Sequence, residues 1–497
     1  MNIILLNPRS AKWNHRAPLS LLALGAVLEG KHDYAIIDEN YEGKVERKLT
    51  EEIRAHRVKY LGVTVMPGPQ LARAVPISST MKARFPDLKI IWGGTFPTIH
   101  TDTVLNSGYV DFVVRGQGEF TLVELIDALE QGGSWEDIRG ISYRKNNAVV
   151  HNPPRELVHP DSLPPLPYHR IDLPRYLART YLGKRTSGLC TSIGCPFLCG
   201  FCSVTAIYNG RWLAKSAASV ANEVLLLKRK YGVDSIEFFD DNFFTSEKRV
   251  AEFCERIKGQ GLAWWGEGRS DTLLNYSDKT LRLMRDTGCK MIYTGAESGS
   301  QEVLELMNKG GKQTPSSILE FADRIKEYGI IPEFSFILGN PTYHIDGAME
   351  HDFRFIRRIK EINPKSEISF HTYAPVLLPG AQLFEEAKKY GFDFPKTLDE
   401  WASSKWEAFG KRKSPYTPWL KPRHRRRIRD FEIVLNAYTP TIADLKITNA
   451  RRKMLRLLSG WRYRTEVYFA PYEIRVILYK LFRYRQPQIE GAEQYST

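Results

Sequence analysis

The sequence contains no uninterrupted apolar run of the ~18 residues that a membrane-spanning helix needs. Its start, from Met1 to Pro8, is too short for a signal peptide and has no basic segment. We therefore expect a buried first strand and a cytoplasmic protein. Cysteine is scarce, with six residues among 497, and none precedes Cys190. This scarcity argues against a disulfide framework and fits a reducing compartment.

Acidic residues are scarce in the C-terminal region, whereas they nearly balance the basic residues in the rest of the chain. Residues 411–497 carry 20 Lys and Arg against seven Asp and Glu, while the whole chain has a net charge of +14. The first 410 residues are therefore nearly neutral, and the body of the protein is not a general polyanion binder. Nucleic acid is not expected as a partner, although basic and aromatic tails of this kind also bind single-stranded RNA.

Three of the cysteines stand together as Cys195, Cys199 and Cys202, with C-x3-C-x2-C spacing. Three thiolates on one loop can hold a [4Fe–4S] cluster, which normally takes four, so one iron is left without a protein ligand. An open coordination position is typical of a catalytic metal centre. The alternative is a structural zinc knot with Cys190 as fourth ligand, although four zinc ligands in so short a segment would be crowded.

Residues 1–140 alternate short apolar strands with helical patterns. Strands are predicted over 2–6, 34–38, 60–65, 89–92 and 110–114, and helices over 19–29 and 70–84. This alternation predicts a Rossmann-like, doubly wound parallel sheet in the α/β class. Ligands bind such sheets at the carboxyl ends of the strands. The residues expected in that crevice are Thr64, Gly93, Gly94, Gly116 and Glu119.

The cysteine motif, with Gly194 and Pro196 around its first cysteine and Phe201 before its last, resembles the radical S-adenosylmethionine (SAM) superfamily. The glycine motifs at 93–98 and 116–119 resemble the cobalamin-binding domain of one branch of it. That branch contains the anaerobic magnesium-protoporphyrin monomethyl ester cyclase and the hopanoid-modifying enzymes. Gln117 departs from the usual acidic residue, and the D-x-H-x-x-G motif whose His ligates cobalt is absent. His100 is the nearest substitute ligand in the sequence.

The resemblance implies a radical SAM enzyme with a [4Fe–4S] cluster, SAM and cobalamin. Such an enzyme cleaves SAM to a 5′-deoxyadenosyl radical and methylates or oxidatively cyclises an unactivated carbon of a small or lipid-like substrate. A reductant protein of the flavodoxin or ferredoxin type is the expected partner. One alternative is an RNA-modifying methylthiotransferase, but its second cluster would need three amino-terminal cysteines. Another is a non-catalytic iron–sulfur protein at a membrane surface.

Residues 186–400, after a Pro-rich extended linker at 141–185, are expected to form the partial (β/α)6 barrel of this superfamily. Strands are predicted over 188–192, 235–239, 263–267, 291–295, 333–338 and 367–373. Barrel chemistry occurs at the carboxyl ends of strands, and residues 374–380 there loosely resemble a P-x-P-G motif of the group. Asp240 could also simply cap a helix. The candidate SAM contacts are Asp240, Glu267, Arg269, Glu297, Gly339 and Pro341.

Residues 401–497 are predicted to form a basic, mainly helical region. Over 472–485 the spacing of Ile474, Ile477, Leu478 and Leu481 predicts an amphipathic helix with cationic flanks. This helix is expected either to make a peripheral contact with anionic lipid at the inner membrane face or to dock on the barrel with its charges in solvent.

Overall fold

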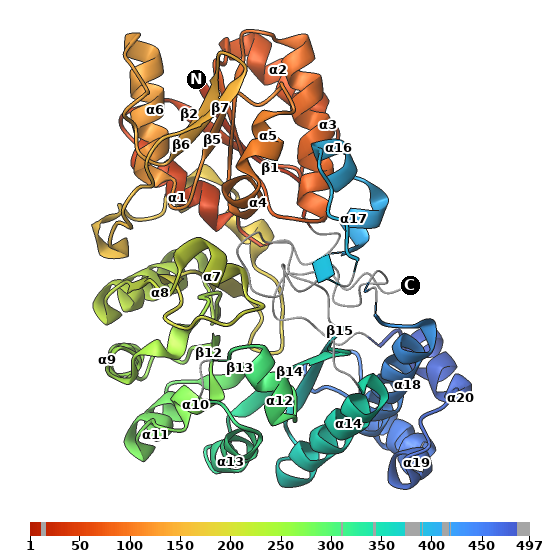
Figure 1. The fold of residues 1–497 in the computed structure, drawn as a ribbon. Coiled ribbons are helices and arrows are strands. Elements are labelled where there is room, and N and C mark those ends of the chain that lie inside the picture. The colour runs from red at the N-terminus through yellow and green to blue at the C-terminus, as the bar shows by residue number, and fades with distance from the viewer. Residues whose placement is uncertain are drawn as a thin grey trace.

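The computed structural model describes residues 1–10, 16–309, 312–340, 344–372, 388–389, 391–409, 417 and 419–484. Two α/β modules lie one above the other in Figure 1, the first from the N-terminal part of the chain and the second from its middle. C-terminal helices flank the second module. The α/β class predicted from the sequence is confirmed.

The first module is a seven-stranded sheet in the order β2-β1-β3-β4-β5-β6-β7. Its first five strands are parallel, because the chain returns through a helix between successive strands. Apolar clusters cover both faces of the sheet. The elements are β1 (Ile3–Asn7), α1 (Leu19–Leu28), β2 (Tyr34–Asp38), α2 (Val45–His56), β3 (Tyr60–Thr64), α3 (Pro69–Arg84), β4 (Lys89–Gly93), α4 (Thr95–Ile99), α5 (Thr101–Leu105), β5 (Phe112–Val114), α6 (Glu119–Gln131), β6 (Ile141–Lys145) and β7 (Ala148–His151).

The first module extends beyond the boundary expected at residue 140. The strands β6 and β7 form an antiparallel hairpin whose turn is Asn146-Asn147. Both asparagines have positive φ, 51° and 62°, as a two-residue hairpin turn requires. Ile141 and Tyr143 are buried and β6 pairs with β5. The linker prediction is therefore wrong for 141–151, because these residues complete the sheet.

The rest of the linker is extended, with three short 3-10 turns at Pro160–Ser162, Tyr168–Arg170 and Leu173–Tyr176. Two tyrosines attach it to opposite modules. The Tyr176 hydroxyl donates to Asp38 over 3.0 Å, and the Tyr168 hydroxyl donates to Glu223 over 2.8 Å. The linker is therefore ordered against both modules.

The second module is a parallel six-stranded sheet in the order β15-β14-β13-β12-β11-β8. All six barrel strands predicted from the sequence are present, with helices between them. The elements are β8 (Thr186–Leu189), α7 (Ser203–Tyr208), α8 (Ala217–Tyr231), β11 (Ser235–Phe238), a 3-10 turn (Phe243–Thr245), α9 (Glu247–Ile257), β12 (Ala263–Gly268), α10 (Ser270–Leu273), α11 (Asp278–Asp286), β13 (Cys289–Glu297), α12 (Gln301–Leu306), α13 (Pro315–Lys326), β14 (Ile331–Leu338), α14 (Ile345–Ile362) and β15 (Glu367–Thr372).

A small two-stranded sheet closes the cysteine loop. Its strands, β9 (Ser192–Gly194) and β10 (Trp212–Ala214), pair antiparallel on either side of the loop. Gly194 has φ +75°, and a Cβ added there would lie 2.2 Å from the Arg211 carbonyl oxygen. Only glycine fits directly before Cys195.

The C-terminal region returns to both modules, as the two groups of blue helices in Figure 1 show. The short helices α16 (Leu398–Trp401) and α17 (Ser404–Phe409) pack on α3 of the first module, where Trp401 and Trp406 join its apolar cluster. The helices α18 (Pro422–Tyr438), α19 (Asn449–Thr465) and α20 (Tyr472–Arg475), with a π-helical turn (Val476–Leu481), pack on the second module.

Half of the apolar stripe predicted over 472–485 faces inward. Ile474 and Leu478 are buried in the same apolar cluster as the barrel helices, because α20 packs on α18. Ile477 is partly buried, whereas Leu481 is 66% exposed. The packing of Ile474 and Leu478 supports the docked alternative for this part of the stripe. Arg485 lies outside the described residues. Over the described part of the chain, no helix is both long and apolar enough to cross a membrane.

Candidate active site between the two modules

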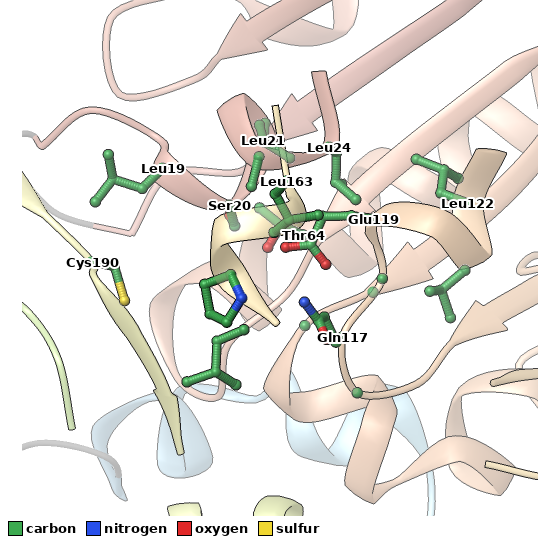
Figure 2. A pocket seen from close by; sticks show the side chains of 18 of the residues that line it. Leu19, Ser20, Leu21, Leu24, Thr64, Gln117, Glu119, Leu122, Leu163 and Cys190 are labelled. Carbon is green, nitrogen blue, oxygen red and sulfur yellow. The ribbon is translucent and has the colours of Figure 1, made fainter. Parts of the chain in front are cut away.

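A cavity of about 420 Å³ lies between the two modules. One wall consists of the carboxyl ends of β3, β4 and β5 with leucines of α1 and α6, and the other contains linker residues and the start of β9 (Figure 2). All five residues predicted for the crevice line it. These are Thr64, Gly93, Gly94, Gly116 and Glu119.

Gly94 has a conformation that the cavity wall depends on. Its φ is +100°, and a Cβ added there would lie 3.0 Å from the Val65 carbonyl oxygen and 3.3 Å from Thr64 Oγ1. Residues with a side chain rarely adopt this conformation. The bare backbone of Gly94 therefore forms this part of the wall, where a flat ligand can approach closely.

Gln117 and Glu119 add polar groups to the same wall (Figure 2). Gln117 Oε1 accepts from the Val158 amide over 2.7 Å, and its Nε2 donates to the Val158 carbonyl over 3.3 Å. An acidic side chain could not make the second bond, which explains the departure from the usual motif. Burial raises the pKa of Glu119.

The second module contributes Cys190, Thr191 and Ser192 to the cavity wall. Cys190 lies between β8 and β9, and in Figure 2 its thiol lies across from Glu119. The Ser192 carbonyl, at 3.5 Å, and the Phe239 carbonyl, at 3.8 Å, are its possible acceptors. Its exposed surface faces this cavity. Among the described residues, no three His, Cys, Asp or Glu side chains are placed to bind a single metal ion.

Asp240 supports this wall from behind and has no exposed surface. Its carboxylate accepts from the Thr191 amide over 3.1 Å, from Thr191 Oγ1 over 2.8 Å and from the Ser192 hydroxyl. The buried guanidinium of Arg249 donates to Thr191 as well. The SAM contact predicted for Asp240 does not fit this position, because the carboxylate is enclosed by the strand that it holds.

The three thiols of the cysteine loop differ in how far they are buried. Cys199 is buried, and Cys195 and Cys202 are half-buried. Burial raises the pKa of Cys202 to about 12 and also raises that of Cys195. The Val204 and Phe197 amides act in the opposite direction by donating to these two sulfurs. Hydrogen bonds to sulfur are a general means of tuning iron–sulfur clusters, so the donor set fits a cluster loop.

Arg269 connects the barrel to this loop. Its Nη1 donates to Cys199 Sγ over 3.5 Å, while Nε and Nη2 bind the Asp271 carboxylate over 2.9 and 2.7 Å. The guanidinium lies 4.0 Å from the centre of the Phe197 ring. Both charged side chains of the pair are 7% exposed. Arg269 is therefore fixed on Cys199.

Residues 189–356 match the Radical SAM superfamily, and residues 16–126 match the B12 binding domain. An uncharacterised methyltransferase of Pyrococcus horikoshii is 32% identical to the chain over 65% of this chain and 70% of the relative. The chain belongs to the cobalamin-dependent radical SAM enzymes. Its cofactors are accordingly a [4Fe–4S] cluster, SAM and cobalamin.

Two other similarities agree with this radical SAM family. The anaerobic magnesium-protoporphyrin IX monomethyl ester cyclase of Synechocystis is 27% identical over 73% of this chain and 72% of that protein. The solved structure of the cobalamin-dependent radical SAM enzyme OxsB, with aqua-cobalamin and SAM bound, superposes with a TM-score of 0.72 at 18% identity. It covers 97% of this chain and 75% of that chain.

Lys309, which sequence reasoning missed, joins several predicted residues of this radical SAM site. Its Nζ lies 3.1 Å from Glu297 Oε1 and 5.6 Å from the centre of the Phe201 ring, and its carbonyl accepts from Arg269. The second Glu297 oxygen accepts from the Ser335 hydroxyl over 3.0 Å. Lys309 and Glu297 are both 6% exposed, so the pair is buried beside the cluster loop.

Asp352, a residue of α14, holds the turn that contains Glu297. Glu297 has φ +65°, a left-handed conformation that costs free energy for a residue with a side chain. The Asp352 carboxylate accepts from Ser298 Oγ and from the Gly299 amide, both over 2.7 Å. Asp352 therefore holds the backbone that turns Glu297 towards Lys309.

The remaining predicted residues have mixed outcomes. Gly339, at φ +80°, accepts a hydrogen bond from the Trp419 indole over 2.9 Å, so the C-terminal region covers this strand end. Glu267 lies near the carboxyl end of β12, as expected. Pro341 and the motif at 374–380 lie outside the described residues.

His100 packs 4.8 Å from the rings of both Phe96 and Trp401 and does not line the cavity, so it does not fit the role of cobalt ligand.

Three functional side chains were not found from the sequence, namely Asp271, Lys309 and Asp352. Lys309 is followed by two glycines and a second lysine, a loop composition that indicates a ligand-facing segment. Asp271 stands two residues after Arg269, a spacing that allows a local ion pair. Asp352 carries no local signal, because its partners lie more than fifty residues earlier in the chain.

Proposed function

We propose that the protein transfers a methyl group to an unactivated carbon of a small substrate at the junction of its two modules. The single observation that carries this proposal is the composition of the cavity. Its walls come from the glycine loops of the B12-binding module and from residues 190–192, which lead into the cluster loop. A corrin in the cavity and a cluster in the loop would therefore serve one reaction centre.

We assign the cluster to Cys195, Cys199 and Cys202, and the corrin to Thr64, Gly93, Gly94, Gly116 and Glu119. When bound, the cluster supplies the electron for SAM cleavage and the corrin carries the methyl group. The chain's own contribution is to hold these groups in line and to exclude water from the cavity between the modules. Glu267, Gly339 and Pro341 stay predictions as SAM contacts.

The contacts of Arg269, Glu297 and Asp240 support other roles than direct binding of SAM. Arg269 would stabilise Cys199, because its N–H groups are taken up by Cys199, Asp271 and the Lys309 carbonyl. Glu297 would place the Lys309 ammonium beside the loop. Asp240 would fix the strand between cavity and cluster.

The similarity to a methyltransferase at 32% identity favours methylation over cyclisation. Methyl transfer through the corrin and radical formation each consume one SAM. Holoprotein reconstituted with cluster and hydroxocobalamin is incubated anaerobically with SAM and a strong reductant. We expect both S-adenosylhomocysteine and 5′-deoxyadenosine. Production of 5′-deoxyadenosine alone would favour an oxidative cyclase, and absence of both products would contradict the proposal.

A matched pair of cysteine variants controls for the cluster assignment. Cys199→Ala should lose the visible absorbance of the cluster and the production of 5′-deoxyadenosine, because two thiolates cannot hold the cluster. Cys254→Ala should keep both, since Cys254 is buried in the apolar core of α9. Equal behaviour of the two variants would reject the assignment.

We also propose an electron donor of the flavodoxin or ferredoxin type, because radical SAM clusters need a reductant of low potential. Reduced flavodoxin should replace the chemical reductant in the assay above. Failure of every such donor, with the chemical reductant still active, would reject this partner. A peripheral membrane contact is proposed as well, through a surface different from the stripe predicted at 472–485.

A further inference from the structure

The outer face of α19 is apolar and is left exposed by the residues that the structure describes. Met454, Leu457, Leu458 and Trp461 follow one another at helical spacing, and all four are exposed. Leu457 is 81% exposed. The opposite face of α19 packs against the rest of the protein through buried Leu455 and Tyr463. An apolar face that remains after the helix has docked marks an interaction surface.

The segment after α19 adds two exposed aromatic residues, Phe469 and Tyr472, to this face. Phe469 is 75% exposed and stands between two non-glycine residues with positive φ, Glu466 at 60° and Ala470 at 47°. The Ala470 amide donates to Asp430 over 3.1 Å. The backbone is thus held in a costly conformation that directs Phe469 outward, while its neighbour Tyr468 points into the core.

Arg462 joins the two parts of this surface. Its guanidinium lies 4.8 Å from the centre of the Trp461 ring and donates to the Phe469 carbonyl over 2.8 Å. It also pairs with Glu473 at 2.6 Å. We call the six residues Met454, Leu457, Leu458, Trp461, Phe469 and Tyr472 the α19 face.

The charges around the α19 face are positive. The helix α19 contains six Arg and Lys and no acidic residue. The two acidic residues that follow, Glu466 and Glu473, are each paired with an arginine. Exposed basic side chains continue through α20 and the π-helical turn to Arg483. The surface therefore combines an apolar centre with a cationic surround.

We propose that the α19 face docks the protein on an anionic lipid bilayer. Exposed leucine and aromatic side chains enter the headgroup boundary, and flanking lysine and arginine bind anionic headgroups. A second copy of the chain fits less well, because two identical cationic surfaces repel each other. An electron donor also fits less well, since α19 lies at the far side of the second module from α7, which begins directly after Cys202 (Figure 1).

The test is sedimentation of the full-length protein with vesicles of phosphatidylcholine alone or mixed with phosphatidylglycerol. We expect binding to the mixed vesicles, weaker binding at raised salt, and little binding to phosphatidylcholine alone. The double substitution Leu457→Asp with Phe469→Asp should reduce binding at least about tenfold. Both positions are exposed, so these changes leave the core intact.

Two further variants make the test specific. Leu226→Asp, at an exposed leucine of α8, is the matched control and should bind vesicles normally. Lys453→Glu should weaken binding to the mixed vesicles alone. Absence of wild-type binding, or equal binding by the double variant, would overturn the proposal. A shift of the double variant from dimer to monomer, without wild-type lipid binding, would instead assign the face to a second copy. Production of 5′-deoxyadenosine by all variants separates this outcome from failure of the enzyme.

Discussion

At the scale of single residues, the contact between Arg269 and Cys199 bears on the redox chemistry. A positive charge and an N–H group next to a cluster thiolate stabilise the reduced, more negative state. Arg269→Gln should therefore lower the midpoint potential of the cluster. A charged hydrogen bond of about 1.5 to 3 kcal/mol corresponds to about 60 to 130 mV for one electron. Redox titration followed by electron paramagnetic resonance measures this shift.

Asp271, whose carboxylate also binds Arg269, provides a control variant in which the midpoint potential should shift in the opposite direction. Asp271 neutralises part of the guanidinium charge, so Asp271→Asn should raise the midpoint potential. A shift of the same sign in both variants would indicate general disturbance of the loop and would contradict the role assigned to Arg269.

Gly94 gives a second prediction at this scale. Gly94→Ala should weaken hydroxocobalamin binding about tenfold, because a side chain at this φ is strained by about 1 to 3 kcal/mol and presses on the Val65 backbone. Spectral titration of the corrin measures the affinity. Gly108→Ala is the control, since Gly108 also has positive φ (+80°) but has open space around it and lies outside the cavity lining. Equal loss in both variants would attribute the effect to strain alone.

The cavity-lining glycines could be predicted because their signal lies in short local motifs. The cysteine motif is a local signal of the same kind, and its assignment to the cluster stays a prediction. Arg269 and Glu297 could be located at strand ends, but their partners could not. Whether a guanidinium faces SAM or Cys199 depends on which loop folds over it, and that loop comes from another part of the chain. Lys309 and Asp352 act only through residues brought to them by the barrel.

At the scale of elements, the junction of β13 with α14 depends on Asp352. Removing its carboxylate leaves the Ser298 hydroxyl and the Gly299 amide buried without a partner. Asp352→Ala should lower the free energy of unfolding by about 2 to 4 kcal/mol, whereas Asp352→Asn keeps an acceptor oxygen and should be milder. Chemical unfolding of the two variants measures the difference, and equal losses would contradict the anchoring role.

The same residue predicts a pH effect. Burial raises the pKa of Asp352 from 3.8 to about 6. Since the folded state binds this proton more tightly than the unfolded state, the contribution to stability is complete below pH 3.8 and is lost as the pH rises through 6. About two pKa units correspond to roughly 3 kcal/mol. Unfolding measured between pH 4 and 7 should show this decline in the wild type and not in Asp352→Asn. The same pH dependence of the unfolding free energy in both proteins would refute the role of Asp352 in this decline.

Short, largely apolar strands were predicted almost to the residue, as β2 and β11 show. The hairpin of β6 and β7 was missed because a Pro-rich segment follows it and one of its strands is largely exposed. In the tail, helical spacing identified an apolar stripe at 474–481, but spacing alone cannot tell whether a stripe faces the core or the solvent. The structure buries Ile474 and Leu478 of that stripe, leaves Leu481 exposed, and exposes another apolar stripe on α19.

At the scale of the whole molecule, one buried ion pair links the modules. Arg16, from the loop before α1, pairs with Glu237 on β11 and lies 4.0 Å from the centre of the Phe239 ring. Arg16→Met should cost about 3 to 5 kcal/mol, because it leaves a buried carboxylate unpaired. The double variant Arg16→Met with Glu237→Leu should recover much of this loss. A thermal-unfolding cycle measures it, and additive losses would show that the pair does not couple the modules.

The return of α16 and α17 to the first module affects how the protein is made. During synthesis the first sheet leaves the ribosome early, but the helices whose tryptophans cover α3 emerge only near the end of the chain. The wall of the cavity supplied by residues 190–192 likewise follows later than the glycine loops. The glycine loops of the nascent B12-binding module are therefore synthesised before the residues of the barrel and of the C-terminal region that later cover this module.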